Sequence, residues 1–184
     1  MRLLPYLFLC SIFIACEPAE FTSKREYLEW VYSEKSELFK TIEKDGLIFE
    51  MVHIPYELDS TSGSLKNLNF QFRIISVEGQ NVLRHFNSDD SEYLERIALL
   101  EYKIGNMFQL FQEDTLYPSF WHYENYRGIR NDVLVHVHFK KQMNTTEDLE
   151  IVFNDEIFGT GKHQFEFDFK KINNPPHLNL TTYE

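Results

Sequence analysis

Alternating apolar and polar residues mark two segments of the chain as β-strands. Residues 68–76 read LNFQFRIIS, in which every second side chain from Leu68 to Ile74 is apolar and those between are polar. Residues 162–169, KHQFEFDF, repeat the pattern with three alternating phenylalanines. Successive side chains of a strand point to opposite faces, so both segments predict strands with one buried face.

Turn residues separate further strand-like runs into hairpins. Lys44-Asp45-Gly46 is a tight-turn signal, and it predicts strands over 37–43 and 46–54. A competing interpretation extends the preceding helix to Ile42, because Leu38 and Ile42 are four residues apart. The remaining strands are expected at 107–112 and in two more hairpins, 119–126 with 132–141 and 148–153 with 162–169.

Two segments carry helical signals. Ser23 is suited to cap a helix over 24–34, with Glu26 three residues later completing a capping box. A second helix is predicted over 90–102. The expected inward residues of that helix are Tyr93, Leu94, Ile97 and Ala98, and the expected outward ones are Glu92, Glu95 and Arg96.

These elements predict an α+β, β-rich fold: an antiparallel sheet or sandwich of about eight strands with two helices. The predicted elements do not alternate strand, helix, strand in the way that produces a parallel sheet. Residues 23–184 are expected to form a single globular domain. Pro175-Pro176 argue against regular strand pairing near the C-terminus.

The N-terminal apolar run predicts a leader rather than a membrane span. Residues 3–15 are mostly apolar but fall short of the ~20 needed to cross a bilayer, and they include Pro5. Residues 13–16, FIAC, resemble the bacterial lipobox, although Phe13 replaces the usual leucine. This resemblance implies a signal peptide over 1–15, acylation of Cys16 by fatty chains such as palmitate, and a lipidated tether over 16–22. A plain secretory signal is the alternative.

Cysteine usage and charge narrow the possible partners. The two cysteines are Cys10, within the leader, and Cys16, so the mature chain has no pair for a disulfide. Without residues 1–15, 17 basic residues face 29 acidic ones, a net charge of −12. Such a chain is not expected to bind nucleic acid, which needs a basic surface. Two or more acyl chains give stable membrane attachment without help from the folded part.

Three longer stretches resemble a known kind of protein. These are EYLEWVYSEKSELFK, GLIFEMVHIPYEL and NDEIFGTGKHQFEF, spread over most of the mature chain. Their spacing and aromatic positions are similar to those of a family of small Bacteroidota lipoproteins of unknown function. The resemblance implies a lipoprotein with one domain. It implies no activity, catalytic residue or ligand.

Several motifs have both a chemical and a structural interpretation. FGTGKH, residues 158–163, lacks the spacing and the following helix of a phosphate loop, so Gly159 and Gly161 are interpreted as turn residues. His136 and His138 share one strand face and with His122 or Glu124 could hold a metal. Two outward histidines without a metal are the preferred interpretation.

Other candidates are less specific. Glu124, Asp132, Asp155 and Glu156 are among the acids that a hydrolase could pair, and Asn154, Asp155 and Glu156 could bind calcium weakly. DST at 59–61 and DTL at 114–116 resemble O-glycan acceptor sites of the same phylum. Aromatic residues crowd one segment: Tyr117, Phe120, Trp121, Tyr123 and Tyr126. On a strand Tyr117, Trp121 and Tyr123 share one face and Phe120 and Tyr126 the other, and one set is expected to pack in the core. The other set, if exposed, would suit a sugar or a protein partner, but core filling is the preferred role for most of these rings.

The sequence therefore predicts a lipoprotein of the cell envelope, expected at the outer membrane, with its domain outside the cytoplasm. Its leading function is a non-enzymatic binding or assembly module with a protein or glycan partner. The alternative is a metal-dependent or carboxylate-based envelope hydrolase acting on glycan or peptide. No cofactor, catalytic residue or metal ligand is assigned, and Cys16 is the one assigned site, for lipid attachment.

Overall fold

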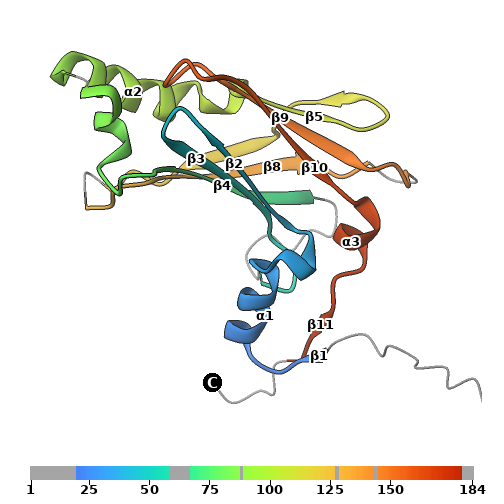
Figure 1. Ribbon diagram of the computed structural model, residues 1–184. Helices are drawn as coiled ribbons and strands as arrows, with labels where there is room; N and C mark the ends of the chain where they lie inside the picture. Colours follow the sequence, from blue (N-terminus) through green and yellow to red (C-terminus); the bar gives the residue numbers. More distant parts are fainter. Residues whose placement is uncertain (1–19, 59–66, 88, 127–128, 143–144, 180–184) are drawn as a thin grey trace, which may run out of the picture.

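Two antiparallel sheets pack face to face in the computed structural model, which describes residues 20–58, 67–87, 89–126, 129–142 and 145–179 (Figure 1). The α+β, β-rich sandwich predicted from the sequence is confirmed. The leader, Cys16 and the segment 59–61 lie outside the described residues, so the predictions made on them stay predictions.

Each sheet follows from the hairpins of the sequence. The five-stranded sheet has the order β2 (Phe39–Lys44), β3 (Leu47–His53), β4 (Asn67–Ser76), β8 (Val133–Lys140) and β7 (Phe120–Tyr123). The four-stranded sheet has the order β10 (Gly161–Phe167), β9 (Leu149–Asp155), β5 (Phe108–Phe111) and β6 (Thr115–Leu116). All eight strands expected from the sequence are present, with ends shifted by a few residues.

Phenylalanine rings fill the space between the sheets. The alternating residues of β4 and β10 that were predicted to be buried point into this core, and Phe72 and Phe165 are at most 1% exposed. Phe72 and Phe153 bring the two sheets together with ring centroids 4.5 Å apart. Aromatic pairs of this kind add to the stability that burial alone provides.

The first hairpin turns as the Lys44-Asp45-Gly46 signal predicts. Asp45 and Gly46 have φ of 53° and 75°, and two successive positive φ values match the right-handed twist of the strands they join. The competing helix to Ile42 is therefore wrong. Helix α1 spans Lys24–Val31, with Ser23 Oγ accepting a hydrogen bond from Arg25 N at 3.2 Å, and a short 3₁₀ turn, Glu34–Ser36, follows it.

Helix α2, Asp90–Tyr102, has the predicted bounds, but its predicted faces are partly wrong. Leu94 is 63% exposed, whereas Arg96 is only 9% exposed. Arg96 Nη1 donates hydrogen bonds to the carbonyls of Leu83 and His85 at 2.8 and 2.9 Å. Its guanidinium also lies over the ring of Phe158, 4.9 Å from the centroid. These partners offset the cost of removing the charge from water. Arg96 therefore points inward, although the apolar periodicity of the helix predicts that its neighbours do.

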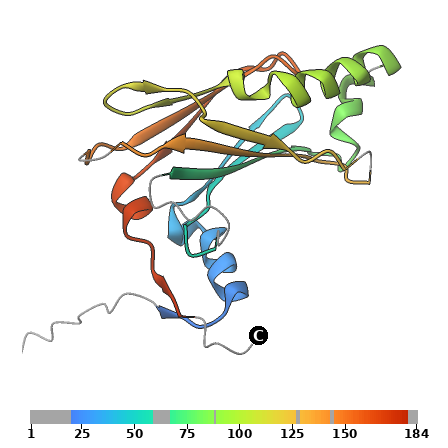
Figure 2. The ribbon, with the colours of Figure 1, turned by 180° about the vertical axis from the view of Figure 1, so that it is seen from behind.

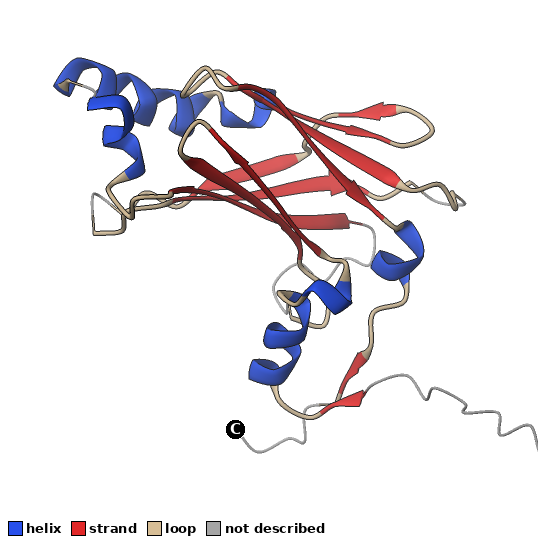
Figure 3. Cartoon of the chain, viewed as in Figure 1, coloured by secondary structure: helices blue, strands red, loops and turns tan. Residues whose placement is uncertain are grey.

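Short elements near the chain ends were not predicted. Helix α3 (Phe169–Asn173) follows β10, and β11 (His177–Leu178) pairs in parallel with β1 (Glu20–Phe21) directly after Pro175-Pro176. The expectation that the two prolines exclude regular pairing near the C-terminus is wrong. Both prolines precede β11, which begins at His177, so neither occupies a paired position. Figures 1 and 2 place α1, α3 and this pair away from α2, which covers the opposite end of the sandwich, and Figure 3 shows the same elements by type.

Candidate functional site

The outer face of the five-stranded sheet is only partly covered. Helix α1 packs over its β2–β3 side, where Tyr27 and Val31 join Val52 in a small apolar cluster. The outer face of β4, β8 and β7 continues beyond the helix. Tyr32, at the end of α1, donates a hydrogen bond from its hydroxyl to Gln71 Oε1 at 2.8 Å and so fixes the helix against β4.

A groove of about 590 Å³ lies between α1 and the exposed strands. We call it the outer-face groove. Its volume falls within the range of small-ligand sites. It is lined by Lys24, Leu28, Ile54, Leu58, Asn69, Phe70, Gln71, Phe120, His122, His136 and His138.

Strand register arranges the polar floor of the groove in rows. Phe120 pairs across the sheet with His138, which pairs with Asn69; the next row joins His122, His136 and Gln71. Asn69 Oδ1 accepts a hydrogen bond from His138 Nδ1 at 2.8 Å. An amide oxygen only accepts, so this bond places a hydrogen on Nδ1. The floor is thus built from side chains that are already oriented.

His136 is held from the side by an acid outside the groove lining. Its Nε2 lies 2.6 Å from Glu124 Oε1, and the hydroxyl of Tyr126 donates to the other oxygen of Glu124. The ring of His122 lies nearly parallel to that of His136, with centroids 6.5 Å apart. His136 and His138 lie on the outer face, as predicted, but both are half-buried rather than fully exposed.

The structure does not gather these residues into a metal centre. No group of three or more His, Cys, Asp or Glu side chains in the described part of the chain is placed to hold an ion. His138 interacts with Asn69, whereas His136 interacts with Glu124.

The nominated acids have separate structural partners. Asp132 accepts hydrogen bonds from Arg73 and Arg130, at 2.9 Å from Arg73 Nε. Burial of the Asp132 carboxylate opposes its ionisation, but the bonds from the two arginines outweigh burial and lower its pKa. Glu50 forms the other ion pair of Arg73, at 3.2 Å. None of these acids lines the outer-face groove.

Asp155 organises the β9–β10 connection. Its carboxylate accepts hydrogen bonds from the backbone N–H groups of Ile157, Phe158 and Thr160, at 2.9 to 3.1 Å, and from the Thr160 hydroxyl at 2.6 Å. His163 Nε2 lies 2.7 Å from that hydroxyl and donates to it, because the hydroxyl hydrogen is directed to Asp155. The calcium loop considered from the sequence is therefore a hydrogen-bonded turn.

The glycines of that connection behave as turn residues. Gly159 and Gly161 have φ of 72° and 89°, a region that side chains disfavour. The interpretation of FGTGKH as a strand connection is confirmed.

The aromatic segment divides between core and surface. Trp121 and Tyr123 pack against the core, whereas Phe120 is 57% exposed at the rim of the outer-face groove. Tyr117 precedes β7 and is exposed, and Tyr126 lies against the guanidinium of Arg130 at 4.8 Å. Trp121 and Phe120 are adjacent in β7, so their side chains point to opposite faces of the sheet, and this alternation was the sequence signal for the division.

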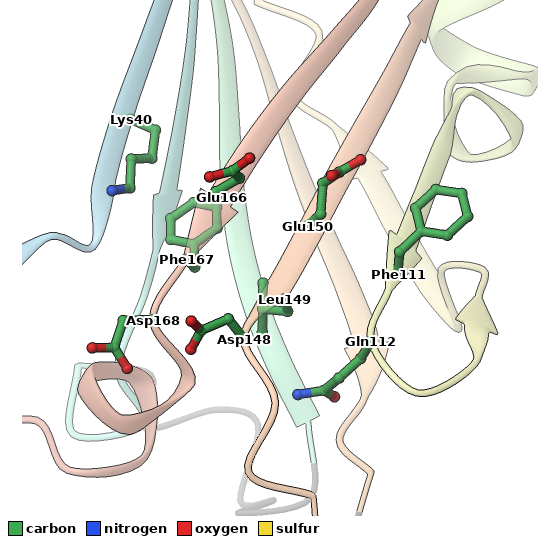
Figure 4. Close-up of a pocket in the computed structure, with 9 residues that line it drawn as sticks. All are labelled: Lys40, Phe111, Gln112, Asp148, Leu149, Glu150, Glu166, Phe167 and Asp168. Carbon is green, nitrogen blue, oxygen red and sulfur yellow. The ribbon is translucent and has the colours of Figure 1, made fainter.

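A second hollow, of about 410 Å³, lies at the seam between β2 and the four-stranded sheet (Figure 4). Three of its four acids have structural roles. Asp148 Oδ1 accepts from Phe169 N at 3.1 Å, and Asp168 caps α3 by accepting from Lys170 N at 2.7 Å. Glu150 accepts from Gln164 at 3.0 Å. The hollow is acidic, unlike the outer-face groove.

No protein-family model matches the chain, and no curated protein is detectably similar to it in sequence. Among the described residues, no helix is both long enough and apolar enough to cross a bilayer.

Proposed function

We propose that this chain is a cell-envelope lipoprotein that binds a glycan in its outer-face groove and is held to the membrane through acylated Cys16. The observation that supports binding most directly is the groove itself. It combines an exposed aromatic ring, Phe120, with planar polar side chains on a single rigid sheet.

The chemistry of the groove fits a sugar unit. A sugar ring has an apolar C–H face and an edge of hydroxyl groups. The ring of Phe120 and the side chains of Leu28 and Ile54 offer apolar surface, while Asn69, Gln71 and the histidines offer hydrogen-bond partners. A few oriented polar groups within apolar walls are typical of ligand sites.

Charge supports the same class of ligand. The chain has 29 acidic residues, yet the groove lining contains none and includes Lys24. A neutral or acidic sugar therefore meets no charge repulsion in the groove. The net negative charge of the chain disfavours polyanions such as nucleic acid.

The proposed anchor lies close to the groove along the chain. Four peptide steps separate Cys16 from β1 at Glu20, a span of at most ~14 Å when extended. Helix α1, which forms one wall of the groove, begins four residues after β1 starts. Acylation at Cys16 would hold the groove near the membrane surface.

A hydrolase is the alternative function, and it lacks a supporting observation. It needs either a metal or two carboxyl groups at a set separation. Of the nominated acids, Asp132 is held by two arginines, Asp155 organises a turn and Glu124 holds His136 from the side, while Glu156 is exposed at the β9–β10 connection. None of the four is itself part of the groove lining.

Replacing Cys16 by serine is expected to release the protein from the membrane, because the acyl chains need the thiol. Membrane fractionation and labelling with an alkyne fatty acid measure the effect. Cys10→Ser, within the proposed leader, is the matched control and should remain labelled and membrane-bound. Unchanged labelling of Cys16→Ser would contradict the proposed anchor.

Replacing Phe120 by alanine is expected to weaken glycan binding about tenfold, because the variant loses the exposed aromatic ring of the groove, on which the apolar face of a sugar would pack, and a loss of ~1.4 kcal/mol is a factor of ten in affinity. Binding of the purified full chain is measured on an array of defined glycans and quantified by calorimetry on those retained. Phe111→Ala is the control, since Phe111 is a partly exposed ring on the other sheet. Retention of no glycan by the wild type, or equal loss in both variants, would refute glycan binding in this groove.

A further inference from the structure

Two apolar strand faces each end in a basic residue at the same end of the sandwich. In β3, every second residue from Leu47 to Met51 is buried in the core, and the next residue of the same parity is His53. In β8, every second residue from Val133 to Phe139 is buried, and the next is Lys141. Strand β4 lies between them, with Phe70 paired to His53 and Leu68 paired to Phe139.

A cavity of about 210 Å³ occupies this end of the core. We call it the end cavity; it lies at the core side of the sheet and shares only Ile54 with the lining of the outer-face groove. Helix α3 closes it with Ile172 and Asn173. The cavity is lined by His53, Ile54, Tyr56, Asn67, Leu68, Lys141, Ile172 and Asn173.

The imidazole of His53 has an unsatisfied nitrogen in this environment. His53 is 5% exposed, and its Nδ1 is buried without a hydrogen-bond partner. Its ring is held edge-on against Phe70, with centroids 5.2 Å apart. A buried polar atom without a partner is unfavourable, so a ligand that accepts a hydrogen bond from it is favoured.

Lys141 adds a positive charge that the cavity does not balance. No Asp or Glu lines the end cavity, and within the described residues Lys141 forms no ion pair. Its ammonium lies 5.7 Å from the centroid of the Phe169 ring, which does not neutralise it. Burial lowers the pKa of Lys141, as expected for a cation partly removed from water.

His53 is suited to donate to a negatively charged ligand. Burial and the charge of Lys141 lower the pKa of His53 to about 3, so its ring is neutral at pH 7. A neutral imidazole carries one N–H, and the tautomer with the hydrogen on Nδ1 donates from the unsatisfied atom. An anion between the two residues would meet a cation on one side and an N–H on the other.

We propose that the end cavity binds a small oxyanion, a carboxylate or a phosphate, between the ammonium of Lys141 and the imidazole of His53. The cavity exceeds the ~30 Å³ share of a single water, so it has room for such a group. The outer-face groove and the anchor play no part in this inference, which therefore stands or falls separately from the proposed function.

Nuclear magnetic resonance titration of the full chain in a non-ionic detergent tests the proposal. Sodium acetate, inorganic phosphate and acetamide, the neutral analogue of acetate, are added at constant ionic strength and pH 7. Acetate or phosphate is expected to shift the His53 ring resonances and the Lys141 side-chain resonances saturably, and to raise the pKa of both groups. Acetamide is expected to leave them unchanged, and the comparison of acetate with phosphate identifies the preferred oxyanion.

Neighbouring lysines provide the matched variants. Lys141→Met removes the charge but keeps a long side chain, and it should weaken oxyanion binding at least tenfold. Lys140→Met is the control, because Lys140 is exposed on the opposite strand face. The midpoint of thermal unfolding should rise with the bound oxyanion in the wild type and in Lys140→Met but not in Lys141→Met. Absence of saturable shifts, equal shifts with acetamide, or equal binding by Lys141→Met would each overturn the proposal.

Discussion

Replacing Asp155 by alanine is expected to lower the free energy of unfolding by about 3–4 kcal/mol. The variant leaves the N–H groups of Ile157, Phe158 and Thr160 without the carboxylate that accepts from them. Two of these bonds are buried, and each unsatisfied buried donor costs about 1–3 kcal/mol. The β9–β10 connection would lose its closed form, and with it the position of His163, whose ring stacks on Phe49 at 4.0 Å.

Urea unfolding followed by tryptophan fluorescence measures this loss. Asp155→Asn keeps one accepting oxygen and should therefore be destabilised less than Asp155→Ala. It should still be less stable than the wild type, because its amide nitrogen cannot accept the hydrogen bonds from Thr160. Glu156→Ala is the control, since Glu156 is the adjacent exposed acid and should change stability by less than ~0.5 kcal/mol. Equal stability of Asp155→Ala and Glu156→Ala would show that the carboxylate does not hold the connection.

Gly105→Ala is expected to cost about 2–3 kcal/mol for a different reason, overpacking. A Cβ atom at this position would lie 2.3 Å from Cδ2 and 2.4 Å from Cε3 of Trp121. Because Trp121 is packed against the core from β7, the indole cannot withdraw without displacing that strand. The neighbouring residue of β7 is Phe120, so glycan binding in the outer-face groove should fall as well.

Two variants distinguish a steric effect from a general loss of glycine. Gly79→Ala meets no atom within 4 Å and is strained only by its φ of 71°, so it should cost about 1–2 kcal/mol and spare binding. Combining Gly105→Ala with Trp121→Leu should be less destabilising than the sum of the two single changes, because the smaller side chain leaves room for the new methyl group. Additive losses would mean that the contact with Trp121 is not the cause.

Hairpins were predictable because their signals are local. Asp45-Gly46 and the glycines of the β9–β10 connection set the turns, and alternation sets the strand faces on either side. A register error of one residue would expose the whole apolar face, so the pattern determines pairing strongly. The opposite faces of Trp121 and Phe120 followed from the same alternation.

Features that depend on tertiary contacts were not predictable. Arg96 is inward because the carbonyls of Leu83 and His85 lie within its reach, which no periodicity reveals. Strands β1 and β11 have two residues each and carry no period. The outer-face groove exists because α1 covers β2 and β3 but stops short of β8. For the end cavity a signal was present: a basic residue continues each of two apolar alternations, at His53 and Lys141.

The pairing of β1 with β11 also determines how the protein would respond to mechanical load. Under the proposed anchorage, tension from the membrane enters at Glu20 and is resisted first by two residue pairs and the ring of Phe21, which contacts Tyr27 at 5.2 Å. Detaching residues 20–23 would lengthen the tether by ~14 Å. The sandwich would lose the packing of Phe21 against the cluster that includes Val52, but its own strand pairs would remain. The pairing of β1 with β11 would thus break before the sandwich unfolds, and it would limit the force that reaches the outer-face groove.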